Sequence, residues 1–153
     1  MSDETLKQIK QQALNFLARR EHASLELRRK LLSKGFDAQL IDQVLTQLQE
    51  SKILSDERFL ESFVRSRINK GQGPLRIQQE LQQRGLAGEP IAEKLDMLSV
   101  EWVERAQQVR QKRFGQSLPH NTRDKVKQMR FLQYRGFTNT QIKAALTAQM
   151  EEM

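Results

Sequence analysis

Few side chains in this sequence are of the kinds that perform catalysis or bind metal ions. The chain has two histidines, His22 and His120, and no cysteine. A zinc site takes three or four converging ligands, which two histidines far apart in the chain do not supply. The absence of cysteine also excludes disulfides and thiolate ligands. We therefore expect no metal ion and no cofactor.

Three acidic residues, Asp56, Glu57 and Glu61, lie close enough in sequence to raise the question of acid–base catalysis. They fall at the predicted start of a helix, where carboxylates interact favourably with the helix dipole. The glycines at 71–73 are followed by proline, not by the Lys-Ser/Thr pair of a phosphate-binding loop. No nucleophile, base and orienting group follow a spacing that would assemble them. The chain is not expected to be an enzyme.

Basic side chains are the abundant functional groups of this protein. The formal net charge is +7 and the pI is about 10.0, which favours polyanions or acidic protein surfaces as partners. The charge is uneven, because the stretch from Arg105 to Lys143 holds ten basic residues and one acid, Asp124. We interpret this stretch as a binding face and the balanced first two thirds as mainly solvated surface.

A threefold repeat must position these side chains. The segments KLLSKGF (30–36), ELQQRGL (80–86) and FLQYRGF (131–137) align on three glycines. Leucine stands four residues before each glycine, a basic residue directly before it, and isoleucine six residues after it. A fixed period of this kind indicates tandem structural units.

Each unit is predicted to contain three helices and no strand, because its apolar residues follow helical spacing. The glycine should end the middle helix with a positive φ, and the leucine before it should pack in the core. Asp37, and Thr138 with Gln141, are predicted to cap the helix that follows. The predicted starts of the middle helices are Ala23, Gly73 and Asp124.

The predicted fold class is all-α, an elongated, curved array of three tandem three-helix repeats with boundaries 1–53, 54–99 and 100–153. Units of about 45 residues bury little core alone, so neighbouring units should stack. No apolar run approaches the ~20 residues of a membrane-spanning helix, and the N-terminus lacks the apolar core of a signal peptide. We expect a cytoplasmic monomer without membrane contact.

The helix after each glycine is poorly suited to reading DNA bases. Residues 37–50 contain no Lys or Arg, and the corresponding helices of the other repeats carry only Lys94 and Lys143. A recognition helix needs side chains that reach base edges and phosphates. The distribution therefore favours a surface that contacts backbone phosphate or an acidic protein face.

Several motifs carry a resemblance to a known family. They are ELRRKL (26–31), DERF (56–59), KGQGPLRI (70–77) and YRGF (134–137). Together they resemble the RecX regulatory proteins over nearly the whole chain. The resemblance implies a curved array of three-helix repeats that is not an enzyme. It further implies binding to the RecA recombinase filament on single-stranded DNA, with inhibition of RecA's ATP hydrolysis, strand exchange and coprotease activities.

One position departs from the family pattern. The family often has serine at the position of Ala23, where it forms a capping box with Glu26. An alanine at a helix cap costs about 1 kcal/mol of local stability. The departure concerns the start of one helix and not the predicted function.

The predicted partner-binding residues are basic side chains on the first two helices of each repeat. We expect them to contact acidic RecA surface and nearby phosphate in the filament groove, with double-stranded DNA as a further candidate partner. They are Arg28, Arg29, Lys30, Arg65, Arg67, Lys70, Arg76, Lys125, Lys127, Arg130 and Arg135.

Two other functions fit the same array. A general nucleic-acid-binding array that acts without a recombinase would bind DNA alone, with an affinity that falls steeply with salt. A peptide-binding helical scaffold would have an apolar groove and little affinity for DNA. The fold alone does not discriminate between these functions.

Overall fold

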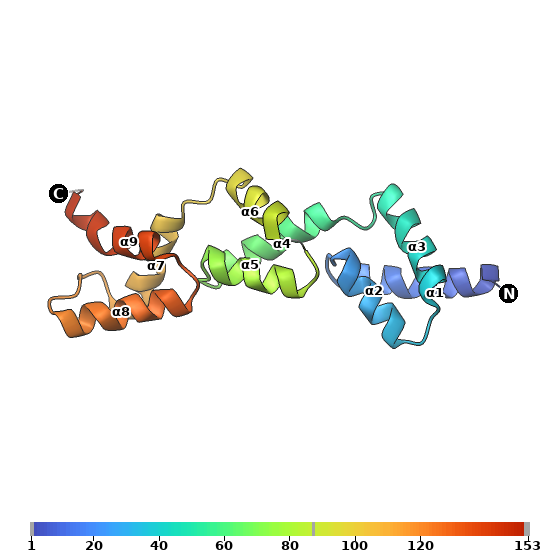
Figure 1. Cartoon of the computed structure of the whole chain (residues 1–153), viewed down its shortest axis with the longest axis horizontal. Coiled ribbons are helices and arrows are strands. Elements are labelled where there is room, and N and C mark those ends of the chain that lie inside the picture. The colour runs from blue at the N-terminus through green and yellow to red at the C-terminus, as the bar shows by residue number, and fades with distance from the viewer. Residues whose placement is uncertain (1, 87, 152–153) are drawn as a thin grey trace. The chain divides into compact units, whose positions relative to one another are not determined.

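The computed structural model describes residues 2–86 and 88–151, and every regular element in these ranges is an α-helix (Figure 1). The prediction of an all-α chain is therefore confirmed. The helices are α1 (Ser2–Arg19), α2 (Ser24–Ser33), α3 (Ala38–Glu50), α4 (Asp56–Asn69), α5 (Pro74–Gln83), α6 (Gly88–Met97), α7 (Trp102–Phe114), α8 (Thr122–Tyr134) and α9 (Asn139–Glu151).

Packing divides the chain into two units that cut across the sequence repeats. The first unit comprises Met1–Phe63 and Leu81–Leu86, and the second comprises Val64–Glu80 and Ala87–Met153. Helices α4 and α5 each have residues in both units. The repeat boundaries at 53 and 99, and the curvature of the array, stay predictions.

The core of the first unit lies between α1, α2 and α3. Leu31, the leucine before the first turn glycine, is fully buried there, as predicted. Because these helices carry apolar residues at helical spacing, each turns one face inward. The buried cluster is Ile9, Ala13, Leu27, Leu31, Ile41, Val44, Leu45, Leu48 and Leu54.

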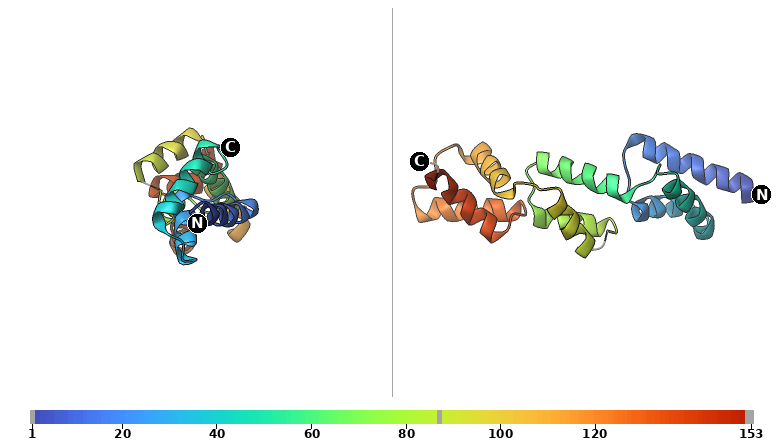
Figure 2. Two further views of the ribbon diagram at one scale, coloured as in Figure 1. Left: turned by 90° about the vertical axis from the view of Figure 1, so that its right-hand side faces the viewer. Right: turned by 90° about the horizontal axis from the view of Figure 1, so that it is seen from above.

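The core of the second unit includes the three-helix group α7, α8 and α9. Helix α7 packs against both α8 and α9, and the three lie side by side (Figure 2). Leu132 is fully buried, and Phe137 folds back into the core after the turn, as a Schellman-type helix end requires. The apolar packing around Leu132 fixes the end of α8.

The turn glycines have the predicted backbone conformation. Their φ angles are +90° at Gly35, +98° at Gly85 and +101° at Gly136. A residue with a Cβ is strained in this region, whereas glycine is not. The predicted caps also form: the Asp37 carboxylate accepts from the Leu40 amide at 3.3 Å, and the Thr138 hydroxyl accepts from the Gln141 amide at 3.1 Å.

One predicted helix start is wrong. Helix α8 begins at Thr122, and its cap is Asn121, whose side-chain oxygen accepts from the Asp124 amide at 2.8 Å. Asn and Asp cap helices about equally well. Because Asn121 can serve as the cap, α8 begins one turn earlier than predicted. Asp124 lies instead in the first turn, where its charge suits the dipole.

The turn of one repeat covers the start of the middle helix in the preceding repeat. In the second unit, the Gly73 amide donates to the Arg135 carbonyl at 2.7 Å and the Leu75 amide donates to the Gly136 carbonyl at 2.9 Å. In the first unit, Gly85 packs directly on the Leu25 side chain at the start of α2. The two contacts use equivalent positions of the repeat.

Candidate functional site

The described residues contain no obvious place for catalysis or metal binding. Within 2–86 and 88–151, no three side chains among His, Asp and Glu converge as metal ligands would. None of the helices in this part of the chain combines the length and apolar character needed to cross a bilayer. The charged side chains are therefore the main candidates for a binding site.

The basic residues predicted in the first repeat make internal contacts. Arg28 pairs with Asp42 at 2.8 Å, and Arg29 donates to the Gln83 carbonyl at 3.1 Å. The Lys30 ammonium lies 2.9 Å from His22 Nε2 and 5.1 Å from the centre of the Phe16 ring. Each of these cations thus has a structural role in the first unit.

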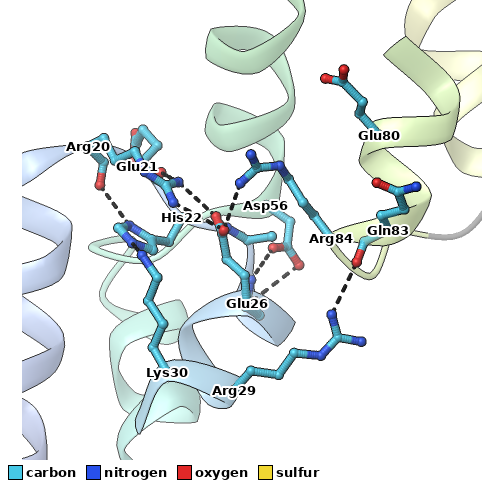
Figure 3. A network of polar contacts seen from close by, with 12 residues as sticks. Arg20, Glu21, His22, Glu26, Arg29, Lys30, Asp56, Glu80, Gln83 and Arg84 are labelled. Atoms are coloured by element: carbon cyan, nitrogen blue, oxygen red, sulfur yellow. Dashed lines mark hydrogen bonds and ion pairs between the residues drawn. The ribbon is translucent and has the colours of Figure 1, made fainter. Parts of the chain in front are cut away.

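A nearly buried carboxylate, Glu26, organises this region (Figure 3). It accepts from Arg20 Nη1 at 2.9 Å, from Arg84 Nη1 at 3.0 Å and from the Ala23 amide at 3.0 Å. Burial alone would raise the pKa of the Glu26 carboxyl, but the hydrogen bonds from Arg20 and the Ala23 amide, with the Arg20 charge, bring it below its ordinary value. Glu26 thus forms half of a capping box, although Ala23 cannot form the other half.

Asp56, the first residue of the DERF motif, accepts hydrogen bonds from the first residue of α2. Its carboxylate accepts from the Ser24 amide at 2.7 Å and from the Ser24 hydroxyl at 3.2 Å. Arg58 of the same motif pairs with Glu21 at 2.7 Å. The motif therefore attaches the start of α4 to the first repeat, which agrees with a capping role for Asp56 and not a catalytic one.

His22 is buried and held as one tautomer. Its Nδ1 lies 3.1 Å from the Arg20 carbonyl, so Nδ1 carries the hydrogen, and Nε2 accepts from the Lys30 ammonium. Burial lowers the pKa of His22, and the positive charges of Arg20 and Lys30 act in the same direction. Protonation of Nε2 would remove the acceptor for Lys30 and place two cations in contact.

We expect the stability of the protein to fall as the pH drops below the ordinary His22 pKa of 6.5. The unfolded chain binds this proton at a higher pH than the folded chain, so unfolding takes up a proton in that window. Urea unfolding at a series of pH values from neutral to mildly acidic measures the effect. The His22→Gln variant should show a flatter profile, whereas His120→Gln, at an exposed position, should keep the wild-type slope. Equal slopes for wild type and His22→Gln would contradict this assignment.

The basic residues predicted in the second repeat divide into paired and exposed groups. Arg67 donates to Glu80 at 2.7 Å, and Arg76 lies 3.5 Å from the same carboxylate. Arg65 and Lys70 are exposed, on α4 and directly after it. Glu80 therefore neutralises part of the charge of this set.

A pocket in the second unit is lined by five basic side chains. It has a volume of about 430 Å³ and lies where the end of α4 meets α7 and α8. None of the described residues that line it is acidic, and its five cations belong to none of the ion pairs found among described residues. These cations are Lys70, Arg105, Lys112, Arg113 and Arg135.

The Phe131 ring holds two of these cations in place. The Arg135 guanidinium lies 5.2 Å and the Arg113 guanidinium 5.8 Å from its centre, and Phe114 packs edge-on against it at 5.3 Å. Arg135 also donates to the Lys70 carbonyl at 3.1 Å, which joins the end of α8 to the end of α4. The pocket, defined by these five cations, is hereafter the basic pocket. An anion that entered this pocket would meet these cations without competition from a carboxylate among the described lining residues.

The basic pocket contains two of the predicted site residues and three that the prediction omitted. Lys70 and Arg135 were predicted, whereas Arg105, Lys112 and Arg113 were not selected. Their positions on α7, with Gln108 and Val109 between them, follow the i, i+3, i+4, i+7, i+8 spacing of one helix face. This spacing in the sequence places the three cations on one face of α7 and could have identified them.

The remaining predicted residues of the third repeat lie outside the basic pocket. Lys125, Lys127 and Arg130 are exposed on α8. A further cation, Arg110, is almost fully buried and donates to the carbonyls of Gln116 and Ser117. Burial lowers the pKa of Arg110. Its role is to hold the loop between α7 and α8.

Each of the three repeats matches one domain of a known protein family. Residues 10–48 match "RecX, first three-helix domain", residues 55–95 match "RecX, second three-helix domain", and residues 99–146 match "RecX, third three-helix domain". The chain belongs to the RecX family. The prediction of three tandem three-helix repeats with RecX resemblance is thereby confirmed.

Individual RecX proteins support the same assignment. The chain is 46% identical over 144 residues to "Regulatory protein RecX" of Halorhodospira halophila, covering 94% of this chain and 89% of the relative. It is 44% identical over 129 residues to the protein of that name from Pseudomonas putida strain W619, covering 84% and 83%. The crystal structure of RecX from Lactobacillus salivarius matches with a TM-score of 0.81 at 22% identity over 99% of both chains, which shows a common fold.

Proposed function

We propose that this protein is a negative regulator of the RecA recombinase. It binds the RecA filament on single-stranded DNA and inhibits ATP hydrolysis, strand exchange and coprotease activity by occupying the filament, without catalysing a reaction itself. Membership of a family of regulatory proteins supports the regulatory role. The acidic protein surface and the phosphates of a filament are anionic, so both suit a chain with a net charge of +7.

The observation that carries this proposal is the basic pocket. Five cations line one cavity whose described lining residues include no carboxylate, and this concentration of positive charge attracts anions. In the first unit, in contrast, Arg20, Arg28 and Arg29 contact internal acids or a carbonyl. We therefore place the main contact with the filament in the second unit and give Arg28, Arg29 and Lys30 a smaller part in it.

The test is a titration of RecA's DNA-dependent ATP hydrolysis with wild type and two double variants. Arg105→Ala with Lys112→Ala removes two exposed pocket cations and leaves the pair packed on Phe131 intact. Lys7→Ala with Lys10→Ala removes the same charge from exposed positions on α1. We expect the pocket variant to need on the order of tenfold more protein for half-inhibition, for about two lost phosphate or carboxylate contacts. The α1 variant should match the wild type.

Binding to the same DNA without RecA is measured in parallel. Inhibition at concentrations well below those that coat free DNA supports a filament target. Inhibition that only follows the coating of DNA would instead support a general DNA-binding array, and equal inhibition by the two double variants would remove the basic pocket from the interface.

A further inference from the structure

Tyr134 is an exposed aromatic side chain that lies outside the apolar core of α7, α8 and α9. It is the only tyrosine of the chain and the last residue of α8, and 76% of its surface is accessible. It lines a second, smaller pocket of about 330 Å³ together with Leu75, Arg76, Gln79, Gln133 and Gly136. A large aromatic side chain left in solvent beside a hollow marks an interaction surface.

The ring of Tyr134 has one face available to a ligand. The Arg76 guanidinium lies over the ring at 5.4 Å from its centre, and Arg76 Nε also lies 3.5 Å from the Glu80 carboxylate. Phe131, in contrast, is surrounded by Arg113, Arg135 and Phe114. Of these two rings on α8, only Tyr134 can accept a further planar group.

The pocket at Tyr134 and the basic pocket share one turn of the chain. Arg135 lines the basic pocket, whereas its neighbours Tyr134 and Gly136 line the smaller one. Both pockets belong to the second unit. A chain with alternating anionic and planar groups would fit this arrangement, with the anion at Arg135 and the planar group at Tyr134.

We propose that Tyr134 stacks against a nucleobase of single-stranded nucleic acid whose phosphates lie in the basic pocket. Single strands bind such surfaces through a basic groove and aromatic side chains, and a stacked base needs no particular sequence. The amides of Gln79 and Gln133 can donate to and accept from the edge of the base. Bases in a duplex are already stacked and cannot reach a ring in this way.

A protein partner is less well matched to this surface than nucleic acid. A protein interface built on Tyr134 and Leu75 would also have to place acidic side chains opposite the five cations of the basic pocket. A nucleic acid supplies one phosphate for every base, so the base and the charges are satisfied together. The inference rests on the proposed function, and it adds that the anion in the basic pocket is backbone phosphate.

The test compares a thymidine oligonucleotide with an abasic oligonucleotide of the same length, which has phosphates and no bases. We expect the wild type to bind the thymidine oligonucleotide about tenfold more tightly, the effect of a stacked base. Tyr134→Ala should lose this preference and keep the wild-type affinity for the abasic strand, and Tyr134→Phe should keep the preference. Because Tyr134 is exposed, an unchanged urea midpoint will show that both variants fold.

Each other outcome counts against the proposal. A Tyr134→Ala variant that retains the preference, or a wild type that binds the two strands equally or binds neither, overturns it. A Tyr134→Ala variant that loses inhibition of RecA but keeps the base preference makes Tyr134 a protein contact and also overturns it. Failure of the RecA regulation itself is seen separately, because ATP hydrolysis is measured with the Arg105/Lys112 variant, in which Tyr134 is intact.

Discussion

The Gly136→Ala variant should unfold about 3 kcal/mol more easily than the wild type, whereas Gly35→Ala should lose only about 1 kcal/mol. Both glycines end a middle helix, with φ of +101° and +90°. A methyl group at Gly136 would meet the backbone nitrogen of Arg76 at 2.7 Å, but at Gly35 no described atom lies within 4 Å. The two variants thus share the backbone strain and differ in the steric clash.

Urea unfolding followed by circular dichroism measures both losses under identical conditions. A methyl group against backbone cannot be accommodated by rotating a side chain, so the start of α5 or the turn itself must move. Equal losses in the two variants would mean that the second-unit turn does not pack on α5 as described. A third variant, Gly85→Ala, should fall between them, because its clash is with the Leu25 side chain.

Replacement of Glu26 by glutamine should lower the free energy of unfolding by about 2 kcal/mol. The full 3–5 kcal/mol of a buried pair is not expected, since the side chains of Arg20 and Arg84 are 44% and 32% exposed and water screens them. Glutamine retains the shape but loses the charge, and its NH2 group replaces one accepting oxygen with a donor that faces guanidinium N–H groups. Asp42→Asn, which breaks the exposed pair with Arg28, should cost less than about 0.5 kcal/mol.

The pH dependence separates the charge of Glu26 from its packing. The lowered pKa of Glu26 means that its contribution is complete above the ordinary value of 4.5 and is lost as the pH falls further. The difference in unfolding free energy between wild type and Glu26→Gln should therefore shrink in acid. A difference that stays constant with pH would show that packing, and not the carboxylate charge, stabilises the start of α2.

Local signals in the sequence predicted much of this fold. The basic-glycine pair predicted each turn, and Leu31, Leu81 and Leu132 were correctly assigned to the core, because helix ends and core positions depend on neighbours a few residues away. The start of α8 was misplaced, because Asn121 and Asp124 are both good caps and the sequence does not say which one takes the position.

The charged contacts could not be predicted in the same way. Glu26 meets Arg84, which is 58 residues away, and the basic pocket forms only where α7 and α8 meet the end of α4. Such pairings depend on how repeats pack and not on spacing along one helix. Arg28, Arg29 and Lys30 illustrate the difficulty, since nothing in the sequence indicated the internal contacts that these three cations make.

Each turn described above packs on the preceding repeat, and this arrangement affects how a chain of such repeats could lengthen by gene duplication. A duplication that copies one whole repeat also copies both halves of the contact, a turn that covers and a helix start that is covered, so no new interface has to evolve. The third repeat differs from the other two at the start of its middle helix. Helix α8 begins fourteen residues before its glycine, against eleven for α2 and α5, and carries its own Asn121 cap. The turn of any further repeat would therefore meet a longer helix start with its own cap, unlike the starts of α2 and α5.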